Sequence, residues 1–180
     1  TPNLQFHIQP ISTDKLGGAN LHDFHAFTPT VANIRPTSRG EISIISSDTK
    51  VNPKIKMNYL STDEDRKVAA DGIKLIRKIV METNEFKKYE PEEFRPGSHL
   101  NEKEEIVKAC SHYAQTIFHP VGTCKMGNDE SAVVSDQLKV HGINKLRVID
   151  ASIMPNITSG NTNAPTIMIA EKGADMILSP

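Results

Sequence analysis

The last third of the sequence has a short apolar run, a polar loop and an apolar helix in that order, and this order constrains the fold more than any other feature. Residues 146–149 form an apolar run that ends at Asp150, as buried parallel strands do. A polar, asparagine-rich loop follows at 155–163, and apolar residues over 167–178 predict a closing helix with Pro165 in its first turn. A strand, a loop and a helix N-terminus in this order are suited to holding a nucleotide cofactor.

The first 60 residues predict strands and loops. Apolar and polar residues alternate over 4–8, which is the pattern of a half-buried strand. Two further short apolar segments, at 42–45 after a turn signal and at 57–60, predict additional strands. Residues 9–40, which include Gly17-Gly18, are predicted to be mostly loop.

Two amphipathic helices are predicted in the middle of the chain. A capping box, in which Ser61 Oγ accepts from the backbone N–H of Glu64, starts a helix whose apolar face runs to Val80. A similar start signal at 101–104 precedes an apolar stripe that ends at Ile117. The prolines and the glycine between the two helices predict a loop.

The composition excludes several classes of function. Hydrophobic residues make up 37% and charged residues 24% of the 180 residues, which is ordinary for a soluble globular protein. The net charge of -1, without a Lys/Arg run, gives no electrostatic footprint for nucleic acid. No apolar stretch approaches the roughly 18 residues that suggest a membrane span. We therefore expect neither a nucleic-acid partner nor a membrane span.

The cysteines and histidines give no metal-ligand pattern. Cys110 and Cys124 fit neither a zinc site nor a disulfide framework, so free core-type thiols and a single disulfide both stay open. His22 and His25 are close in sequence, but such a pair belongs to a solvated loop more often than to a metal site. We expect no metal.

His119 is the residue most suited to chemistry. It lies between a predicted helix and a glycine-containing turn, and Pro120 forces it toward an extended conformation that ends the helix. A histidine held at such a junction can face a cleft and act as a base near neutral pH. A hydrogen-bonded structural histidine is the alternative that the residues alone leave open.

Nearby polar motifs have simpler explanations. Gly122 and Gly127 have the spacing of a phosphate-binding P-loop, but no Lys-Ser or Lys-Thr follows, so that function is rejected. Asn161 and Asn163 precede the last helix, and if one of them is the N-cap, the other is free for another task. Asn156 matches the glycosylation acceptor pattern, but we expect it to be buried and unmodified if its loop lies against a cofactor.

Five segments of the last third carry a family resemblance. They are His119-Pro-Val-Gly-Thr-Cys-Lys-Met-Gly127, Val133-Val-Ser-Asp136, Val140-His-Gly142, Leu146-Arg-Val-Ile-Asp-Ala-Ser152 and Asn161-Thr-Asn-Ala-Pro-Thr166. In this order and spacing they resemble the glucose–methanol–choline oxidoreductases, and residues 31–40 look like the start of that family's carboxy-terminal region. Within the family, the chain is most similar to the insect glucose-dehydrogenase-like branch.

The resemblance implies a set of site residues and the cofactor FAD. His119 matches a histidine that stands beside the flavin ring, and Asn161 matches a second His or Asn of the family, so these two form the implied catalytic pair. The implied cofactor-binding residues are Asp150, Ala151, Thr162 and Asn163. The first two match residues that approach the ribityl and phosphate portion, and the last two match positions beside the isoalloxazine.

The expected fold is α+β. Residues 1–116 are expected to supply an antiparallel sheet with helices, as part of the substrate domain. Residues 117–180 are expected to supply the closing strand and helix of an FAD-binding α/β domain. The family's Gly-x-Gly-x-x-Gly motif, which holds the ADP half of FAD near the amino terminus, is absent from these 180 residues. We therefore expect this chain to be a fragment that needs the amino-terminal half of the same enzyme as its partner.

The function implied by the resemblance is FAD-dependent oxidation of an alcohol, a sugar among the candidates, to a carbonyl compound. His119 would take the hydroxyl proton, Asn161 would bind the oxygen, and hydride would pass to flavin N5. Oxygen or a quinone is the expected electron acceptor. Two alternatives stay open: an FAD-containing hydroxynitrile lyase of the same family, and a truncated, non-catalytic domain. The resemblance also allows an extracellular location.

Overall fold

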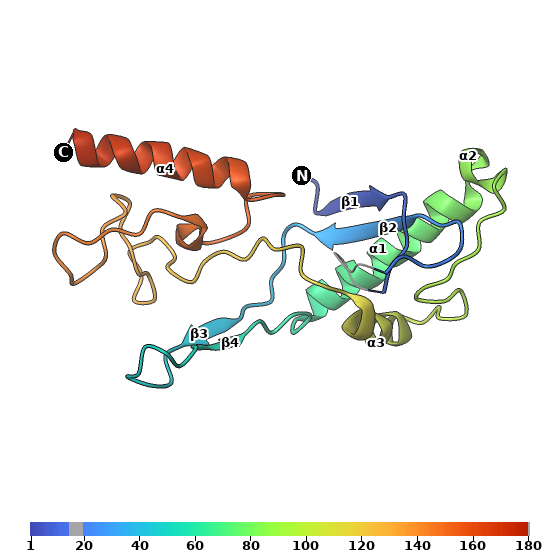
Figure 1. Ribbon diagram of the computed structural model, residues 1–180, viewed down its shortest axis with the longest axis horizontal. Coiled ribbons are helices and arrows are strands. Elements are labelled where there is room, and N and C mark those ends of the chain that lie inside the picture. The colour runs from blue at the N-terminus through green and yellow to red at the C-terminus, as the bar shows by residue number, and fades with distance from the viewer. Residues whose placement is uncertain (15–19, 180) are drawn as a thin grey trace. The chain divides into compact units, whose positions relative to one another are not determined.

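The computed structural model describes residues 1–14 and 20–179, and the chain divides into two units whose elements are labelled in Figure 1. Unit 1 contains residues 1–38 and 59–117, and unit 2 contains residues 39–58 and those from 118 onward. Both units have a two-stranded antiparallel sheet and at least one helix, so the expected α+β class with antiparallel strands is confirmed. The expected single sheet is instead two small ones.

The sheet of unit 1 pairs β1 (Leu4–Gln9) with β2 (Thr28–Asn33). The predicted strand at the amino terminus is therefore confirmed, whereas β2 corrects the prediction of loop over 9–40. Pro29 lies within β2, and it is tolerated because a strand in a two-stranded sheet has one side that needs no N–H donor. The predicted loop residues Gly17-Gly18 lie outside the described residues.

Helix α1 (Asp63–Glu82) packs on β2. Its N-cap is Thr62, whose extended backbone brings Oγ1 within 3.3 Å of the backbone nitrogen of Asp65. The predicted capping box that begins at Ser61 is therefore wrong by one residue. A Cβ added to Gly72 would lie 3.0 Å from Cγ1 of Val31, so the glycine allows the helix to approach the strand closely.

Helices α2 (Asn84–Lys87) and α3 (Lys103–Tyr113) complete the regular elements of unit 1. The capping box of α3 uses Glu102 and Glu105, again one residue later than predicted, and the helix ends before the predicted limit of Ile117. α3 packs against α1 and its Ile106 is fully buried.

Asp65 is a buried carboxylate that holds together the start of α1 and the segment that follows β2. It accepts hydrogen bonds from Nδ2 of Asn33 at 3.2 Å and from the backbone nitrogens of Thr37 and Ser38, both at 2.9 Å. Burial opposes ionisation, but the hydrogen bonds from Ser38 and Thr37 outweigh it and hold the pKa of Asp65 below its usual range.

The sheet of unit 2 pairs β3 (Glu41–Ser43) with β4 (Lys54–Lys56). β3 lies at the start of the predicted segment 42–45, but the segment predicted at 57–60 is not a strand. Asn58 and Leu60 have φ angles of 56° and 53°, in the left-handed region, and the chain turns there instead of extending.

The rest of unit 2 consists of loops around a small core, the short 3-10 helix η1 (Ala151–Ile153) and helix α4 (Asn163–Leu178). The buried core residues are Val134, Leu138, Ile153, Met154 and Ile169. The predicted closing helix is confirmed as α4. A Cβ added to its Gly173 would lie 2.7 Å from Cγ2 of Ile149, so the helix packs closely on that segment.

The strand predicted at 146–149 is not formed as a continuous strand. Among the described residues, this segment has one isolated bridge, between Lys139 and Arg147. Two backbone hydrogen bonds, from Val140 N to the oxygen of Leu146 and from Val148 N to the oxygen of Leu138, flank that bridge. A strand requires a continuous ladder, and the expected place of this run in an FAD-binding α/β domain stays a prediction.

The described residues also show the state of both cysteines and of Asn156, and how their helices compare with a membrane span. Helices long and apolar enough to cross a membrane are absent from the part of the chain that the structure describes. Cys110 and Cys124 are free thiols, and burial raises the pKa of the Cys110 thiol. Asn156 is exposed and its Oδ1 accepts a hydrogen bond from Arg39, while its burial against a cofactor stays a prediction.

Candidate functional site

His119 is held by a backbone segment with unusual local conformation. Phe118, the residue before it, has a φ of 64°, in the left-handed region that bulky residues rarely adopt. Gly122 has a φ of 91°, and a Cβ at that position would lie 3.3 Å from the carbonyl oxygen of Met154. Gly122 adopts this conformation without strain because it has no side chain, whereas Phe118 must be held in it by the surrounding structure.

Backbone hydrogen bonds fasten this segment to η1. Cys124 N donates to the oxygen of Ser152 at 3.0 Å, and Met126 N donates to the oxygen of Ile153 at 2.8 Å. The glycine at 122 allows the turn to approach Met154. The position of His119 is therefore determined by loops that bond to each other.

The side chains of Asn161 and Thr162 contact the two ring nitrogens of His119. Nδ2 of Asn161 lies 2.7 Å from Nε2, and Oγ1 of Thr162 lies 3.0 Å from Nδ1. The backbone N–H of Thr162 also donates to Nδ1, at 3.4 Å. Thr162 is buried, His119 is half-buried and Asn161 is exposed, so one face of the group is accessible to a small molecule.

These contacts indicate where the ring proton lies. An amide nitrogen is a donor only, so the 2.7 Å contact requires Nε2 of His119 to be an acceptor. A neutral imidazole then carries its proton on Nδ1, and Oγ1 of Thr162, at 3.0 Å, can accept it. The 3.4 Å hydrogen bond from the backbone N–H of Thr162 needs the opposite tautomer, and we give precedence to the two shorter contacts. In this arrangement the single lone pair of Nε2 accepts from the amide of Asn161.

The N-cap position of α4 is occupied by Thr162, and its side chain makes no hydrogen bond to the first turn of the helix. The prediction that Asn161 or Asn163 serves as the N-cap is therefore wrong, because the backbone places the residue between them there. Asn163 is the first residue of α4 and is exposed. The N-terminal end of the helix, which has positive potential, thus lies beside His119.

Asp150 and Ala151 belong to the turn of η1. The carboxylate of Asp150 accepts from the backbone nitrogen of Ser152 at 2.7 Å and from its hydroxyl, so Asp150 caps η1. Asn163, another residue with a predicted role in binding FAD, is the first residue of α4. Their predicted roles in binding FAD stay predictions.

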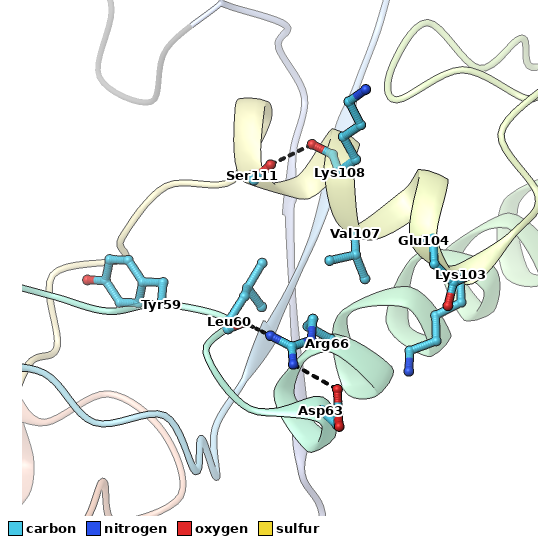
Figure 2. Close-up of a pocket in the computed structure, with 9 residues that line it drawn as sticks. All are labelled: Tyr59, Leu60, Asp63, Arg66, Lys103, Glu104, Val107, Lys108 and Ser111. Atoms are coloured by element: carbon cyan, nitrogen blue, oxygen red, sulfur yellow. Dashed lines mark hydrogen bonds and ion pairs between the residues drawn. The ribbon is translucent and has the colours of Figure 1, made fainter.

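An open pocket on unit 1 is separate from the predicted site residues (Figure 2). It has a volume of about 560 Å³ and is lined by residues of α1 and α3 and of the turn before α1. Arg66, one of the basic residues that line this pocket, already donates to the oxygen of Leu60 and to Asp63. We give more weight to the His119 group, because convergent polar atoms determine chemistry more than open volume does.

The structure brings together three of the predicted site residues, His119, Asn161 and Thr162. Sequence reasoning placed Thr162 beside a cofactor and missed its contact with the histidine ring. The signal that could have found it is its position directly after Asn161, because two adjacent loop residues can reach the two nitrogens of one imidazole. The catalytic roles themselves stay predictions.

Comparisons with known proteins match nearly the whole chain. A model of the GMC oxidoreductase carboxy-terminal domain matches residues 36–170. An oxygen-dependent choline dehydrogenase of Proteus mirabilis is 46% identical over 176 residues, which cover 98% of this chain and 31% of that protein. A choline dehydrogenase of the same description from Acinetobacter baumannii is 44% identical, with 98% and 32% covered.

Solved structures agree with this match. The crystal structure of pyridoxine 4-oxidase from Mesorbium loti aligns with a TM-score of 0.86 at 28% identity, covering 99% of this chain and 35% of that one. A formate oxidase of Aspergillus oryzae, whose FAD modification has been studied, aligns with a TM-score of 0.79 at 32% identity, covering 87% and 28%. The chain therefore spans about a third of the length of the relatives it matches.

Proposed function

We propose that this chain, which belongs to the GMC oxidoreductase family, takes part in the FAD-dependent oxidation of an alcohol to a carbonyl compound. His119 is the base that accepts the hydroxyl proton, and Asn161 binds the hydroxyl oxygen. The observation that carries the proposal is the 2.7 Å contact between Nδ2 of Asn161 and Nε2 of His119. A hydroxyl group that displaces this contact can donate to Nε2 and accept from Nδ2, because the two atoms already converge on one point.

The chain's own residues perform the proton chemistry. The O–H bond of the substrate breaks, and its proton forms a new bond to Nε2 of His119. The amide N–H of Asn161, released from the ring, donates to the oxygen on which negative charge develops. FAD, when bound, supplies the acceptor for the hydride that leaves the carbinol carbon.

The residues around His119 fit a flavin. The first turn of α4 receives no hydrogen bond from its N-cap side chain, and its backbone N–H groups suit the edge of a flavin that gains negative charge on reduction. We propose that Thr162 and Asn163 line the isoalloxazine and that Asp150 and Ala151 approach the ribityl and phosphate portion. The remaining two thirds found in the relatives would supply the contacts to the ADP half.

Small primary alcohols are the substrates that the relatives favour. The names of the choline dehydrogenases and of pyridoxine 4-oxidase refer to small molecules with a hydroxymethyl group. The assignment to the insect glucose-dehydrogenase-like branch, with a sugar as substrate, stays a prediction that a direct comparison of substrates can decide.

The test is anaerobic flavin reduction in the complete enzyme that contains this chain. Choline, pyridoxine and glucose are added in turn, and loss of flavin colour identifies an alcohol that donates hydride. Oxygen or a quinone is then added to the reduced enzyme to identify the acceptor. A hydroxynitrile lyase or a non-catalytic protein would keep its flavin colour with every alcohol, and that result would overturn the proposal.

Replacement of the base tests the mechanism. His119→Ala should slow flavin reduction by about 10² to 10⁴, the usual contribution of a positioned general base, with little change in FAD content. The matched control is His141→Ala, because His141 is an exposed histidine of the same unit whose ring contacts the backbone oxygen of Gly127. An unchanged rate in His119→Ala at neutral pH would remove His119 from its role.

A further inference from the structure

We infer that Thr162 is a positioning residue for the reaction, which accepts the Nδ1 proton of His119 and so keeps Nε2 free to act as the base. The inference rests on the proposed function and adds a residue to it. Its basis is the 3.0 Å contact between Oγ1 of Thr162 and Nδ1 of His119, on the side of the ring opposite to Asn161.

The hydroxyl of Thr162 is used in a way that its position in the helix does not explain. Threonine at an N-cap ordinarily accepts from a backbone N–H of the first turn, which stabilises the helix. Here that side chain makes no such bond, and its oxygen contacts the histidine ring instead. Thr162 is 7% exposed, so its hydroxyl is largely shielded from water and the ring nitrogen is its partner.

The helix also holds this hydroxyl in place. The carbonyl oxygen of Thr162 accepts from the backbone nitrogen of Thr166 at 3.0 Å, as the first backbone hydrogen bond of the helix. A β-branched side chain has few accessible χ1 rotamers, so a fixed backbone fixes the direction of Oγ1. The histidine ring is therefore oriented from the first turn of α4.

The proton balance shows when this contact is most useful. Before the reaction, Nδ1 of His119 carries the ring proton and donates it to Oγ1 of Thr162, while Nε2 is unprotonated. When Nε2 accepts the substrate proton, the ring becomes an imidazolium and the Nδ1 proton stays in its bond to Thr162. Hydrogen bonds with one charged partner are stronger than neutral ones, so the contact stabilises the charged ring more than the neutral one.

The experiment replaces the hydroxyl without changing the shape of the side chain. In the complete enzyme, Thr162→Val should slow anaerobic flavin reduction by about 10- to 10²-fold, while the apparent Kd of the alcohol changes by less than about threefold. The expected loss is below the ~10⁴ found when the carboxylate that fixes a histidine tautomer in serine proteases is neutralised, because a hydroxyl is neutral. Thr162→Ser, which keeps the oxygen, should recover most of the lost rate.

The matched control is Thr166→Val, which removes a hydroxyl from the same helix turn that contacts a backbone oxygen. It should reduce flavin at close to the wild-type rate. FAD content is measured for every variant, and Thr162→Ala serves as a second hydroxyl-free variant if Thr162→Val does not assemble with FAD.

A double-mutant cycle separates positioning from direct contact with the substrate or the flavin. If Thr162 acts through the ring, Thr162→Val added to His119→Ala should slow flavin reduction by less than about twofold further. An equal effect of Thr162→Val with and without His119, or a Thr162→Ser variant as slow as Thr162→Val, would overturn the inference. If His119→Ala slows flavin reduction but Thr162→Val reduces flavin at the wild-type rate, this inference alone is overturned. If His119→Ala leaves the rate of flavin reduction unchanged, the proposed function is overturned.

Discussion

In unit 1 a helix of 20 residues packs on a two-stranded sheet and on a second helix, whereas unit 2 closes its core largely with loops around η1 and α4. Asp65, the buried carboxylate of unit 1, has a structural role, because backbone and side-chain donors satisfy its hydrogen-bonding capacity. Unit 2 has its polar group, His119 with Asn161 and Thr162, on an accessible surface.

The difference shows how the candidate site obtains its geometry. The side chains that we propose to reach one substrate atom are held by loops, which are shaped by backbone hydrogen bonds and by glycines with positive φ such as Gly122. Loops of this kind carry function because a regular helix or strand cannot direct two neighbouring side chains to the same point. They also have fewer contacts to hold them when a partner is missing.

The largest expected effect comes from studying residues 1–180 alone. We expect a colourless preparation without alcohol-dependent activity, because the glycine-rich motif that binds the ADP half of FAD is absent from this sequence. Ordering the loop 155–163 costs on the order of 1 kcal/mol per residue in backbone entropy, so its amides should exchange rapidly. Hydrogen exchange should show α1 protected in the same sample.

Addition of the amino-terminal half should restore both the colour and the activity. A yellow and active preparation of residues 1–180 alone would contradict the fragment interpretation. Slow exchange over 155–163 in that sample would contradict the contrast between the two units.

Core substitutions should separate the two units by their effect on the reaction. Ile106→Ala in unit 1 and Val134→Ala in unit 2 both shorten a fully buried side chain. The first should lower the free energy of unfolding by about 2 to 5 kcal/mol and the second by about 1 to 3 kcal/mol. Urea titration of the complete enzyme measures both changes.

Only Val134→Ala should also slow flavin reduction in the folded enzyme, by about tenfold. The oxygen of Val134 accepts from Gly127 N, at the end of the segment that carries His119, and small displacements of a catalytic group are costly. Equal effects of the two variants on the reduction rate would contradict the proposed separation of roles.

The smallest effect concerns pH and unit 1. The pKa of Asp65 is lowered in the folded state, so its hydrogen bonds stabilise the protein above the unfolded pKa of about 4 and are lost as the pH falls through the folded value. Asp65→Asn should lower the free energy of unfolding by about 1 to 3 kcal/mol at pH 7. The difference from wild type should shrink below about pH 4, and a difference independent of pH would contradict the role of the ionised carboxylate.

Local sequence patterns predicted the elements of unit 1 better than those of unit 2. The helices were found within one residue at their starts, because periodic apolar residues report burial directly, but several adjacent residues can cap a helix and the choice among them depends on tertiary contacts. β2 was missed because Pro29 suggested a loop. The run 146–149 was predicted as a strand from its apolarity, yet pairing partners decide whether a strand forms.

The candidate site could be predicted only in part. His119 and Asn161 are 42 positions apart in sequence, and no periodicity connects them. Their pairing was predicted from the family resemblance alone. The contact of Thr162 with the ring depends on the backbone conformation at the start of α4, which the sequence does not display. The resemblance paired His119 with Asn161, and the structure adds Thr162 and the atoms through which the three side chains meet.

The hairpin of β3 and β4 leaves and re-enters unit 1 at a single point. The hydroxyl oxygen of Ser38, the last residue before the hairpin, accepts from the backbone nitrogen of Ser61 at 3.0 Å, just after the chain returns. A segment whose ends are joined in this way can change in length at little thermodynamic cost, since each doubling of a flexible loop costs only about 0.6 kcal/mol. The turn between the two strands, residues 44–53, can therefore change in length without disturbing the helices, and this is where we expect insertions and deletions to accumulate among relatives.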